Sequence, residues 1–401
     1  MIFTDTEGQK DLPRYFAPVF EQVRRMETGQ LDIRLDDGRI FRARGRKPGP
    51  AADLHIHNPD CFTRLIREGD LGFSDAYLEG WWSTTDLQAF MDLVHMGGET
   101  VYDDFRGQAL LRAYERLRFW LHRNHRRQAK KNISYHYDLG NEFYSLWLDD
   151  TMTYSSALFH SGQDSLETAQ TAKYASLVDQ MGVQPGDHVL EIGCGWGGFA
   201  EYAAKERGLR VTGLTISKEQ LNFARRRIEK AGLSGLVELR MQDYRDCRGQ
   251  FDGIASIEMF EAVGQKYWPA YFTTIRDRLK PGGKATLQII TVADRRWEIY
   301  QKGVDFIQKH IFPGGMLPSP KILREQVEKA GLGVVRSIEF GDSYDQTLRR
   351  WHETFNARWG QIARMGFDER FHKMWNFYLT SCAAAFKTGN CDVTQITVAH
   401  R

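Results

Sequence analysis

From about residue 170 onward the chain alternates strand-like and helix-like segments, and this alternation most constrains its fold. Short apolar runs, each long enough for a single strand, are separated by longer stretches with helical spacing. The expected strands are 187–192, 209–214, 236–241, 251–257 and 284–291, and the expected helices include 199–207 and 218–231. Strands that alternate with helices form a mostly parallel, doubly wound sheet, so we expect an α/β fold.

A glycine-rich loop follows the first of these strands. Gly193, Gly195 and Gly197 stand between strand 187–192 and helix 199–207. Glycines let the backbone turn sharply and approach a ligand closely at the carboxyl ends of parallel strands. The position therefore predicts a cofactor-binding loop, with a purely structural turn as the simpler alternative.

The residues around this loop distinguish between possible cofactors. A dinucleotide site needs an acidic residue at the end of the second strand, where this chain has Thr215 and Ser217. No Gly-Lys-Ser/Thr sequence follows the loop, so a phosphate-binding loop is not indicated either. Gln242 and Asp243 come directly after the third strand, where an amide and an acid can recognise an adenine edge. The set predicts S-adenosylmethionine (AdoMet).

The first hundred residues mix hairpin and helix patterns. Residues 31–35 and 40–44 alternate apolar and polar side chains around an Asp-Asp-Gly turn, which predicts a β-hairpin. Helices are expected at 61–67 and 86–94, the second with Thr85 as its N-cap. We therefore expect a small α+β domain without an obvious catalytic cluster.

Composition excludes several classes of function. Lys plus Arg total 54 and Asp plus Glu total 52, and a net charge of +2 argues against a dedicated nucleic-acid binder. The five cysteines include no CxxC pair, so we expect no metal site and no disulfide framework, and a reducing cytosol is the natural compartment. The N-terminus lacks the pattern of a signal peptide, and no run of ~18 apolar residues predicts a membrane span.

One segment predicts contact with a membrane surface. Residues 112–131 contain eight Lys and Arg against a single acid, with apolar residues at helical spacing. This pattern is typical of a basic amphipathic helix. Such a helix either connects two domains, with its apolar stripe packed on a neighbour, or binds an anionic membrane surface.

Seven motifs together resemble those of the cyclopropane fatty acid synthase family, in the same order along the chain. They are YSSA at 154–157, LEIGCGWGG at 190–198, LTISKEQ at 214–220, QDYRD at 242–246, MFEAVG at 259–264, IFPGGMLPS at 311–319 and YDQTL at 344–348. The segments GDLG at 69–72 and YLEGWW at 77–82 resemble the small domain of bacterial members. The resemblance implies methylation of a double bond in an unsaturated phospholipid acyl chain.

The same resemblance implies a domain organisation. Residues 1–125 would form an N-terminal domain for lipid handling or dimer formation, including the basic connector helix. Residues 126–401 would form a Rossmann-like class I AdoMet methyltransferase domain with insertions that bind the acyl chain. We accordingly expect a cytoplasmic homodimer, peripherally associated with the inner face of the cell membrane.

Carried over residue by residue, nine positions would bind the cofactor. The methionine and ribose would lie against Gly193, Gly195 and Gly197, the ribose region against Thr215 and Gln220, and the adenine against Gln242 and Asp243, with Tyr154 and Ser155 closing over it. Two of these have simpler alternatives. Thr215 would serve equally as a helix cap, and Asp243 as a turn residue.

The implied reaction needs a site that tolerates positive charge. Methyl transfer to an alkene leaves a carbocation on the acyl chain, and an aromatic face stabilises a cation by ~0.5–2 kcal/mol. Tyr154 and Tyr344 are the preferred candidates for this role. Phe159, Tyr267 and Trp268 are further candidates, although the usual place of such residues is the core.

The base in the family is a bound bicarbonate, and the resemblance assigns five residues to it. Glu261, Tyr344 and the backbone of Ile290 match the family, whereas Ser156 stands at a Cys position and Gln288 at a His position. A glutamine cannot carry the positive charge of an imidazolium, so an anion there would be held less strongly. The base is then a differently held bicarbonate or Glu261 itself, and the product is a cyclopropane or a methyl- or methylene-branched chain.

Two other classes of function remain open at this point. Some amine N-methyltransferases share much of this motif set and need a base but no membrane access. A non-catalytic lipid-binding protein with the same fold is the third possibility, which the complete glycine loop and the presence of Glu261 and Tyr344 argue against.

Overall fold

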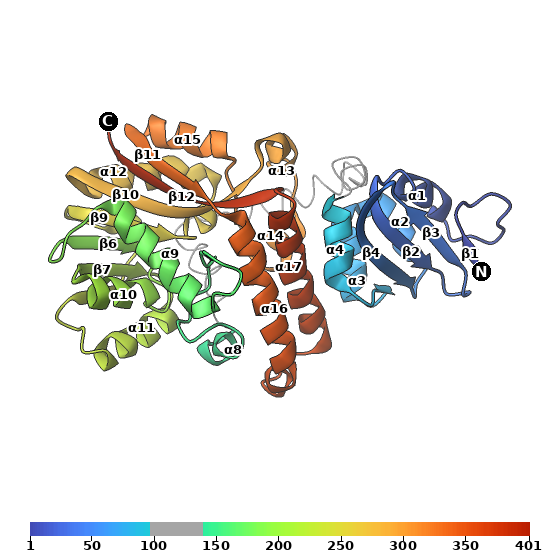
Figure 1. Ribbon diagram of the computed structural model, residues 1–401, viewed down its shortest axis with the longest axis horizontal. Coiled ribbons are helices and arrows are strands. Elements are labelled where there is room, and N and C mark those ends of the chain that lie inside the picture. The colour runs from blue at the N-terminus through green and yellow to red at the C-terminus, as the bar shows by residue number, and fades with distance from the viewer. Residues whose placement is uncertain (97–138) are drawn as a thin grey trace. The chain divides into compact units, whose positions relative to one another are not determined.

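The computed structural model describes residues 1–96 and 139–401, in two compact units (Figure 1). The described parts of the first unit are 1–96, 301–311 and 363–390, and those of the second are 139–300, 312–362 and 391–401. The basic helix predicted within 112–131 and the domain boundary predicted near residue 125 lie outside the described residues.

The first unit contains a five-stranded sheet in the order β1-β3-β2-β4-β5. Its strands are β1 (Ile2–Phe3), β2 (Thr28–Arg34), β3 (Ile40–Arg44), β4 (Lys47–Ile56) and β5 (Trp82–Ser83). The predicted hairpin is confirmed, because β2 and β3 are antiparallel neighbours with Ile33 opposite Phe41. Leu35 and Phe41 are buried, in line with the alternation of apolar and polar residues that predicted these strands.

Six helices among the described residues pack in this unit. They are α1 (Phe16–Val23), α2 (Asp60–Glu68), α3 (Asp70–Leu78), α4 (Leu87–Met96), α14 (Phe306–His310) and α17 (Glu369–Lys387). The prediction of Thr85 as the N-cap of α4 is wrong. Asp86 takes that role, since its Oδ1 accepts the Ala89 N–H over 2.9 Å, while the hydroxyl of Thr85 donates to Asp53.

The first unit contains two segments from later in the chain besides its N-terminal part. Two later segments belong to it because they pack on its helices. Gln88 of α4 donates to the Thr380 carbonyl of α17 over 3.1 Å, and Lys387 Nζ of α17 lies 2.9 Å from Asp92 Oδ2 of α4. The chain thus enters and leaves this unit several times. Local sequence patterns cannot predict such a topology, because they do not show which distant segments pack together.

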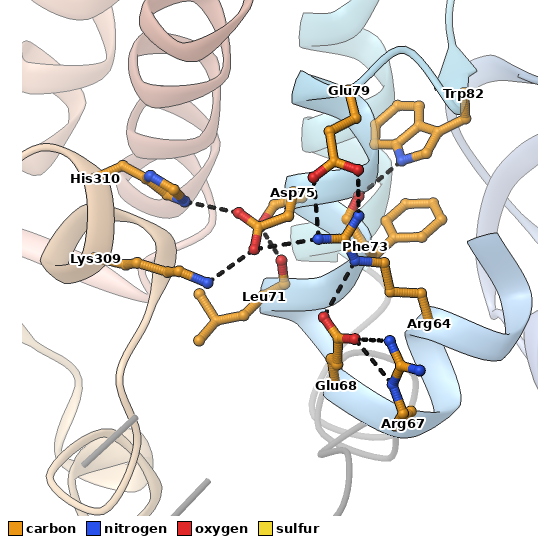
Figure 2. Close-up of polar contacts among 11 residues, drawn as sticks. Arg64, Arg67, Glu68, Leu71, Phe73, Asp75, Glu79, Trp82, Lys309 and His310 are labelled. Carbon is orange, nitrogen blue, oxygen red and sulfur yellow. Dashed lines mark hydrogen bonds and ion pairs between the residues drawn. The ribbon is translucent and has the colours of Figure 1, made fainter. Parts of the chain in front are cut away.

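A buried carboxylate joins α14 to α3 within this unit (Figure 2). Asp75 accepts from Lys309 Nζ and from the His310 ring, each over 2.8 Å, and Arg64 Nη2 lies 3.7 Å away. Burial raises the pKa of the Asp75 carboxyl, but its bonds to His310 and Lys309 outweigh burial and lower that pKa to about 2. Asp75 thus stabilises the first unit as an ionised group.

The second unit contains a seven-stranded sheet in the order β11-β12-β10-β9-β6-β7-β8. Its strands are β6 (His188–Ile192), β7 (Arg210–Thr215), β8 (Val237–Met241), β9 (Phe251–Ile257), β10 (Leu279–Val292), β11 (Leu332–Glu339) and β12 (Cys391–His400). The strands from β10 to β8 are parallel neighbours, and β12 runs antiparallel between β10 and β11. The predicted mostly parallel, Rossmann-like α/β fold is confirmed.

Helices cover both faces of this sheet (Figure 1). The helices of this unit are α8 (Asn141–Ser145), α9 (Leu166–Met181), α10 (Gly198–Arg207), α11 (Lys218–Lys230), α12 (Trp268–Arg278), α13 (Trp297–Tyr300), α15 (Pro320–Lys329) and α16 (Gly341–Arg364). Consecutive strand residues face different cores. Val189 packs with residues of α9, α10 and α11, while Leu190 packs with residues of α12 and α15.

No helix in the described parts of the chain is long and apolar enough to cross a bilayer.

Candidate active site

The glycine loop lies at the carboxyl end of β6, as predicted. Gly193 has a φ of +86°, and a Cβ there would lie 2.8 Å from Met259 Cγ, so only glycine fits. The N–H groups of Gly193 and Cys194 both donate to the Leu214 carbonyl, which fixes the loop to the end of β7. Gly195 also has a positive φ, of +50°, and Gly197 begins α10. Together these features form a tight strand–turn–helix loop of the cofactor-binding type.

The polar residues predicted to bind the cofactor lie at the same edge of the sheet. Thr215 pairs with Met241 across β7 and β8, so Gln242 and Asp243 follow directly beside it. The Thr215 hydroxyl donates to Gln220 Oε1 over 3.2 Å and accepts the Ser217 N–H over 3.1 Å. Thr215 is not the cap of the following helix, which was the simpler alternative. Ser217 caps that helix, because its hydroxyl accepts the Gln220 N–H.

Asp243 is held in a fixed orientation beside this edge. Its carboxylate accepts from Arg245 Nε over 2.8 Å and from Nη2 over 2.6 Å, and it also accepts the Arg245 N–H. Asp243 therefore begins a short turn, which is the simpler role predicted for it. The bidentate pair also fixes the carboxylate where the end of β8 leads into the site.

A buried carboxylate next to the glycine loop supports the fit to a cationic cofactor. Glu191 lies in β6, two residues before Gly193, and is 2% exposed. Its Oε2 is buried, and no described residue donates a hydrogen bond to it. Burial raises the pKa of Glu191 to about 8. The ammonium group of AdoMet, placed beside Glu191, would lower this pKa and donate to the resulting carboxylate, so the residues here fit this cofactor.

Aromatic side chains from several segments gather beside Tyr154. Its ring centroid lies 5.4 Å from those of Tyr144 and Trp351 and 5.5 Å from that of Trp147. Tyr344 contacts the same Trp351 at 6.3 Å. The structure thus brings together Tyr154 and Tyr344, the two aromatic residues preferred for stabilising a cation.

The other three aromatic candidates lie elsewhere. Trp268 is buried in the core against Phe260, and Phe159 lies under the guanidinium of Arg350 at 4.4 Å. The cationic groups of Arg245 and Lys266 lie 5.6 Å and 5.7 Å from the ring of Tyr267. Phe159 and Tyr267 already face protein cations and Trp268 lies in the core, so we assign all three a structural role.

Glu258 is the centre of the polar part of the site, and the sequence analysis did not identify it. It follows β9 directly and has a φ of +49°, which is unusual for a residue other than glycine. Its Oε1 accepts the Ser156 N–H and Gln288 Nε2, each over 2.8 Å, and its Oε2 accepts the Tyr344 hydroxyl over 2.6 Å. Three segments distant in sequence therefore converge on one carboxylate.

The five residues predicted to hold a bicarbonate come together, but their bonds go to protein groups. Ser156, Gln288 and Tyr344 donate to Glu258, with Ser156 using its backbone N–H, while its hydroxyl donates to the Ala157 carbonyl. The Ile290 N–H donates to Glu261 Oε1 over 2.6 Å. The structure thus brings these residues together, with Glu258 at their centre.

Glu261 differs from Glu258 in how it is supported. No described residue donates to its buried Oε2, so the Ile290 N–H is the one donor found for its carboxyl in this part of the chain. Burial and, to a lesser extent, the nearby Glu258 charge together raise the pKa of Glu261 to about 8. At neutral pH Glu261 is therefore mainly protonated.

Lys173 is a second functional candidate that sequence reasoning missed. It lies on α9 with none of its surface exposed, and its Nζ donates to Ser155 Oγ over 2.7 Å. Burial lowers the pKa of this ammonium, while the charge of Glu258 opposes that effect. Burying a lysine is costly unless its charge is compensated, and the three carboxyl groups of Glu258, Asp149 and Glu191 act on Lys173 in this way. This arrangement indicates a role in the site.

Comparison with known protein families gives a match over most of the chain. The model of the family described as mycolic acid cyclopropane synthetase matches residues 124–396. This range includes the glycine loop, Glu258, Glu261 and Tyr344. It thus contains the whole site described above.

Individual relatives are similar over nearly the full length. A tuberculostearic acid methyltransferase of Mycobacterium tuberculosis is 37% identical, with 95% of this chain and 91% of the relative covered. A cyclopropane-fatty-acyl-phospholipid synthase of Escherichia coli is 38% identical over 86% of this chain and 87% of its own. Among solved structures, a mycolic acid cyclopropane synthase in complex with SAH and CTAB has a TM-score of 0.63 and 32% identity, over 67% of this chain and 97% of that one.

Proposed function

The chain belongs to the mycolic acid cyclopropane synthetase family and is an AdoMet-dependent methyltransferase, and from that premise we propose its reaction. The proposed substrate is the double bond of an unsaturated fatty acyl chain in a membrane phospholipid. Bound AdoMet supplies the electrophilic methyl group. Its transfer to one alkene carbon leaves a carbocation on the other, and loss of a proton gives a cyclopropane or a methyl- or methylene-branched chain.

The observation that carries this proposal is the pairing of carboxylates with aromatic rings at the glycine-loop edge of the sheet. Glu258 and Glu261 lie at the end of β9, and Tyr344 joins Glu258 to the aromatic cluster around Trp351. Negative charge and aromatic faces both stabilise a cation, which a reaction through a carbocation requires. An alkene has no acidic proton before methyl transfer, so the base acts only afterwards.

The cofactor-binding roles follow from position in the sheet. We assign the methionine and ribose to Gly193, Gly195, Gly197, Thr215 and Gln220, the adenine to Gln242 and Asp243, and the cover of the cofactor to Tyr154 and Ser155. The common edge formed by β6, β7 and β8 supports this assignment. Glu191 is an addition to the set, as the acceptor for the amino group of the cofactor.

The acyl chain of a membrane phospholipid must reach the site from the bilayer. A phospholipid chain must leave the bilayer to reach a protein interior, so we propose peripheral binding to an anionic membrane surface. The basic segment 112–131 would provide the contact, and the first unit would assist lipid handling or dimer formation. The names of the lipid-modifying relatives support a lipid substrate.

Methyl transfer to vesicles tests the reaction. The purified chain is incubated with labelled AdoMet and vesicles of dioleoyl-phosphatidylglycerol, and the fatty acids are analysed by gas chromatography with mass spectrometry. We expect label in the oleoyl chain and none in matched vesicles of dipalmitoyl-phosphatidylglycerol. Label on added amines and none on lipid would favour the alternative, an amine N-methyltransferase.

A further inference from the structure

Every donor that the family pattern assigns to a bicarbonate is directed at a carboxylate or carbonyl of the protein itself. Glu258 receives the bonds of Gln288, Tyr344 and the Ser156 backbone, and Glu261 receives that of Ile290. A bicarbonate on these donors would have to displace a side chain and lie beside the negatively charged Glu258. The residues present do not fit a resident bicarbonate.

The backbone holds Glu258 in this place at a conformational cost. A φ of +49° is disfavoured for any residue with a Cβ, and glutamate has no local bond that compensates for it. The Glu258 N–H donates to the Gln288 carbonyl over 2.8 Å, so Gln288 binds both the backbone and the side chain of Glu258. Backbone conformations of this kind persist where the surroundings enforce them, and they cluster at active sites.

A further layer of amides orients Gln288. Its Oε1 accepts from Gln395 Nε2 over 3.1 Å, and Gln395 Oε1 accepts from Ser176 and Gln180, each over 2.7 Å. Gln288 and Gln395 are both fully buried. With its oxygen occupied in this way, Gln288 must present its NH₂ group to Glu258, which favours an ionised acceptor.

Charge balance also favours an ionised Glu258. Burial raises the pKa of the Glu258 carboxyl, and the bonds from Tyr344 and Gln288 together with the charge of the fully buried Lys173 act against that rise. Lys173 Nζ donates to the hydroxyl of Ser155. The next residue, Ser156, donates its backbone N–H to Glu258. Glu261 has only the Ile290 N–H among the described residues and is mainly protonated, so Glu258 is the better proton acceptor of the two.

We propose that Glu258 is the base of the reaction in place of bicarbonate, and that Lys173 is a positioning residue that keeps Glu258 ionised. This inference rests on the proposed function. In the step, a C–H bond of the methylated chain breaks and its proton goes to the Glu258 carboxylate. The electron pair of that bond forms either the third bond of a cyclopropane or a new carbon–carbon double bond. Glu258 then returns the proton to water.

The test uses the full chain with labelled AdoMet and dioleoyl-phosphatidylglycerol vesicles. Wild type is assayed in buffer freed of carbon dioxide and again with added bicarbonate, and we expect the same turnover in both. Glu258→Gln should lose ~10²-fold or more in turnover, as expected for removal of a general base. Its affinity for AdoMet, measured by calorimetry, should be unchanged. Glu261→Gln is the matched control and should lose less.

Three results would overturn the proposal. They are a wild type that needs bicarbonate, a Glu258→Gln enzyme with full turnover, and a greater loss in Glu261→Gln than in Glu258→Gln. Glu258→Asp keeps a carboxylate, so it should retain more turnover than Glu258→Gln, and the bicarbonate assay needs no variant at all. Failure of the proposed function is a different result, in which wild type itself transfers no methyl group to lipid.

Discussion

The Tyr344 hydroxyl donates to Glu258 Oε2 over 2.6 Å and so joins α16 to the end of β9. The same tyrosine contacts the aromatic cluster through Trp351. One residue therefore connects the proposed base to the rings that would face the carbocation.

Replacing Tyr344 by Phe should slow the reaction and change its pH dependence. A hydrogen bond to a charged group contributes ~1.5–3 kcal/mol, so turnover should fall by roughly 10- to 100-fold. Burial raises the pKa of Glu258, and the Tyr344 bond opposes that effect. Loss of the bond should therefore raise this pKa further and move the rising limb of the pH–rate profile to higher pH.

The pH–rate profile of kcat measures this effect directly. Tyr202→Phe is the matched control, since Tyr202 lies on α10 and its hydroxyl accepts from Arg207. A Tyr344→Phe enzyme with lower turnover but an unshifted profile would show that the contact is only structural.

Replacing Lys173 by Met should separate stability from activity. Methionine has a similar length and no charge. Removing the buried ammonium removes its desolvation cost, and Glu258 takes up a proton instead of remaining an uncompensated buried charge. We expect the Tm of Lys173→Met to equal or exceed that of the wild type. Turnover at neutral pH should fall by about tenfold, because loss of a nearby opposite charge raises a carboxyl pKa by ~1 unit or more.

Thermal unfolding and turnover are measured on the same preparations. Lys205→Met, at an exposed position of α10, is the control for loss of a lysine. If Lys173→Met lost stability and activity together, Lys173 would be a structural residue rather than a positioning one.

Much of the fold follows from sequence pattern, and the departures have physical causes. Strand β9 has the predicted bounds, 251–257, because its apolar run is buried between parallel neighbours. The sequence prediction includes no strand at β11 or β12. In β12 the residues Thr394, Gln395 and Thr397 are buried polar groups, and they obscure the alternation that marks an antiparallel strand.

The site could be predicted only where a motif contains the residue. Glu261 and Tyr344 lie inside motifs, whereas Glu258 lies one position before MFEAVG and its left-handed backbone has no sequence signal. Lys173 would ordinarily be assigned to the solvated face of a helix, but β10 and β12 cover that part of α9. Trp351 was missed because a tryptophan in an amphipathic helix usually packs in the core.

Replacing Gly193 by Ala should weaken cofactor binding without unfolding the chain. The added Cβ would meet Met259 Cγ at 2.8 Å, and the φ of +86° is strained for alanine. We expect AdoMet affinity to fall by more than about tenfold, since the loop must move to relieve the clash. Calorimetry measures this affinity.

Gly186 provides the control for backbone strain alone. It also has a positive φ, of +91°, but a Cβ there would meet nothing within 4 Å, and it precedes β6 rather than following it. Gly186→Ala should lose stability and keep its AdoMet affinity. Equal affinity losses in both variants would remove the glycine loop from the cofactor site.

Asp75→Asn should destabilise the first unit in a pH-dependent manner. Folding lowers the pKa of Asp75 from 3.8 to about 2, so the ionised carboxylate stabilises the fold by about 2 kcal/mol above pH 4. Arg64, Lys309 and His310 are the charged or titratable groups that face it. This contribution is lost as the pH falls from 4 toward 2, through the folded-state pKa.

Urea unfolding at pH 7 and at pH 3 measures the difference. Wild type and Asp75→Asn should differ most at pH 7 and less at pH 3. Asp37→Asn, at an exposed turn, is the control. A difference between wild type and Asp75→Asn that grew with acidity would contradict the assignment of Asp75 as an ionised stabilising group.

We propose that the chain methylates the double bond of a phospholipid acyl chain. Mass spectrometry of fatty acids from dioleoyl-phosphatidylglycerol vesicles, after incubation with methyl-labelled AdoMet, tests it most directly. We predict an acyl chain heavier by one labelled one-carbon unit, located at the former double bond. Label confined to a headgroup or an amine, or none transferred to the oleoyl chain, would contradict the account.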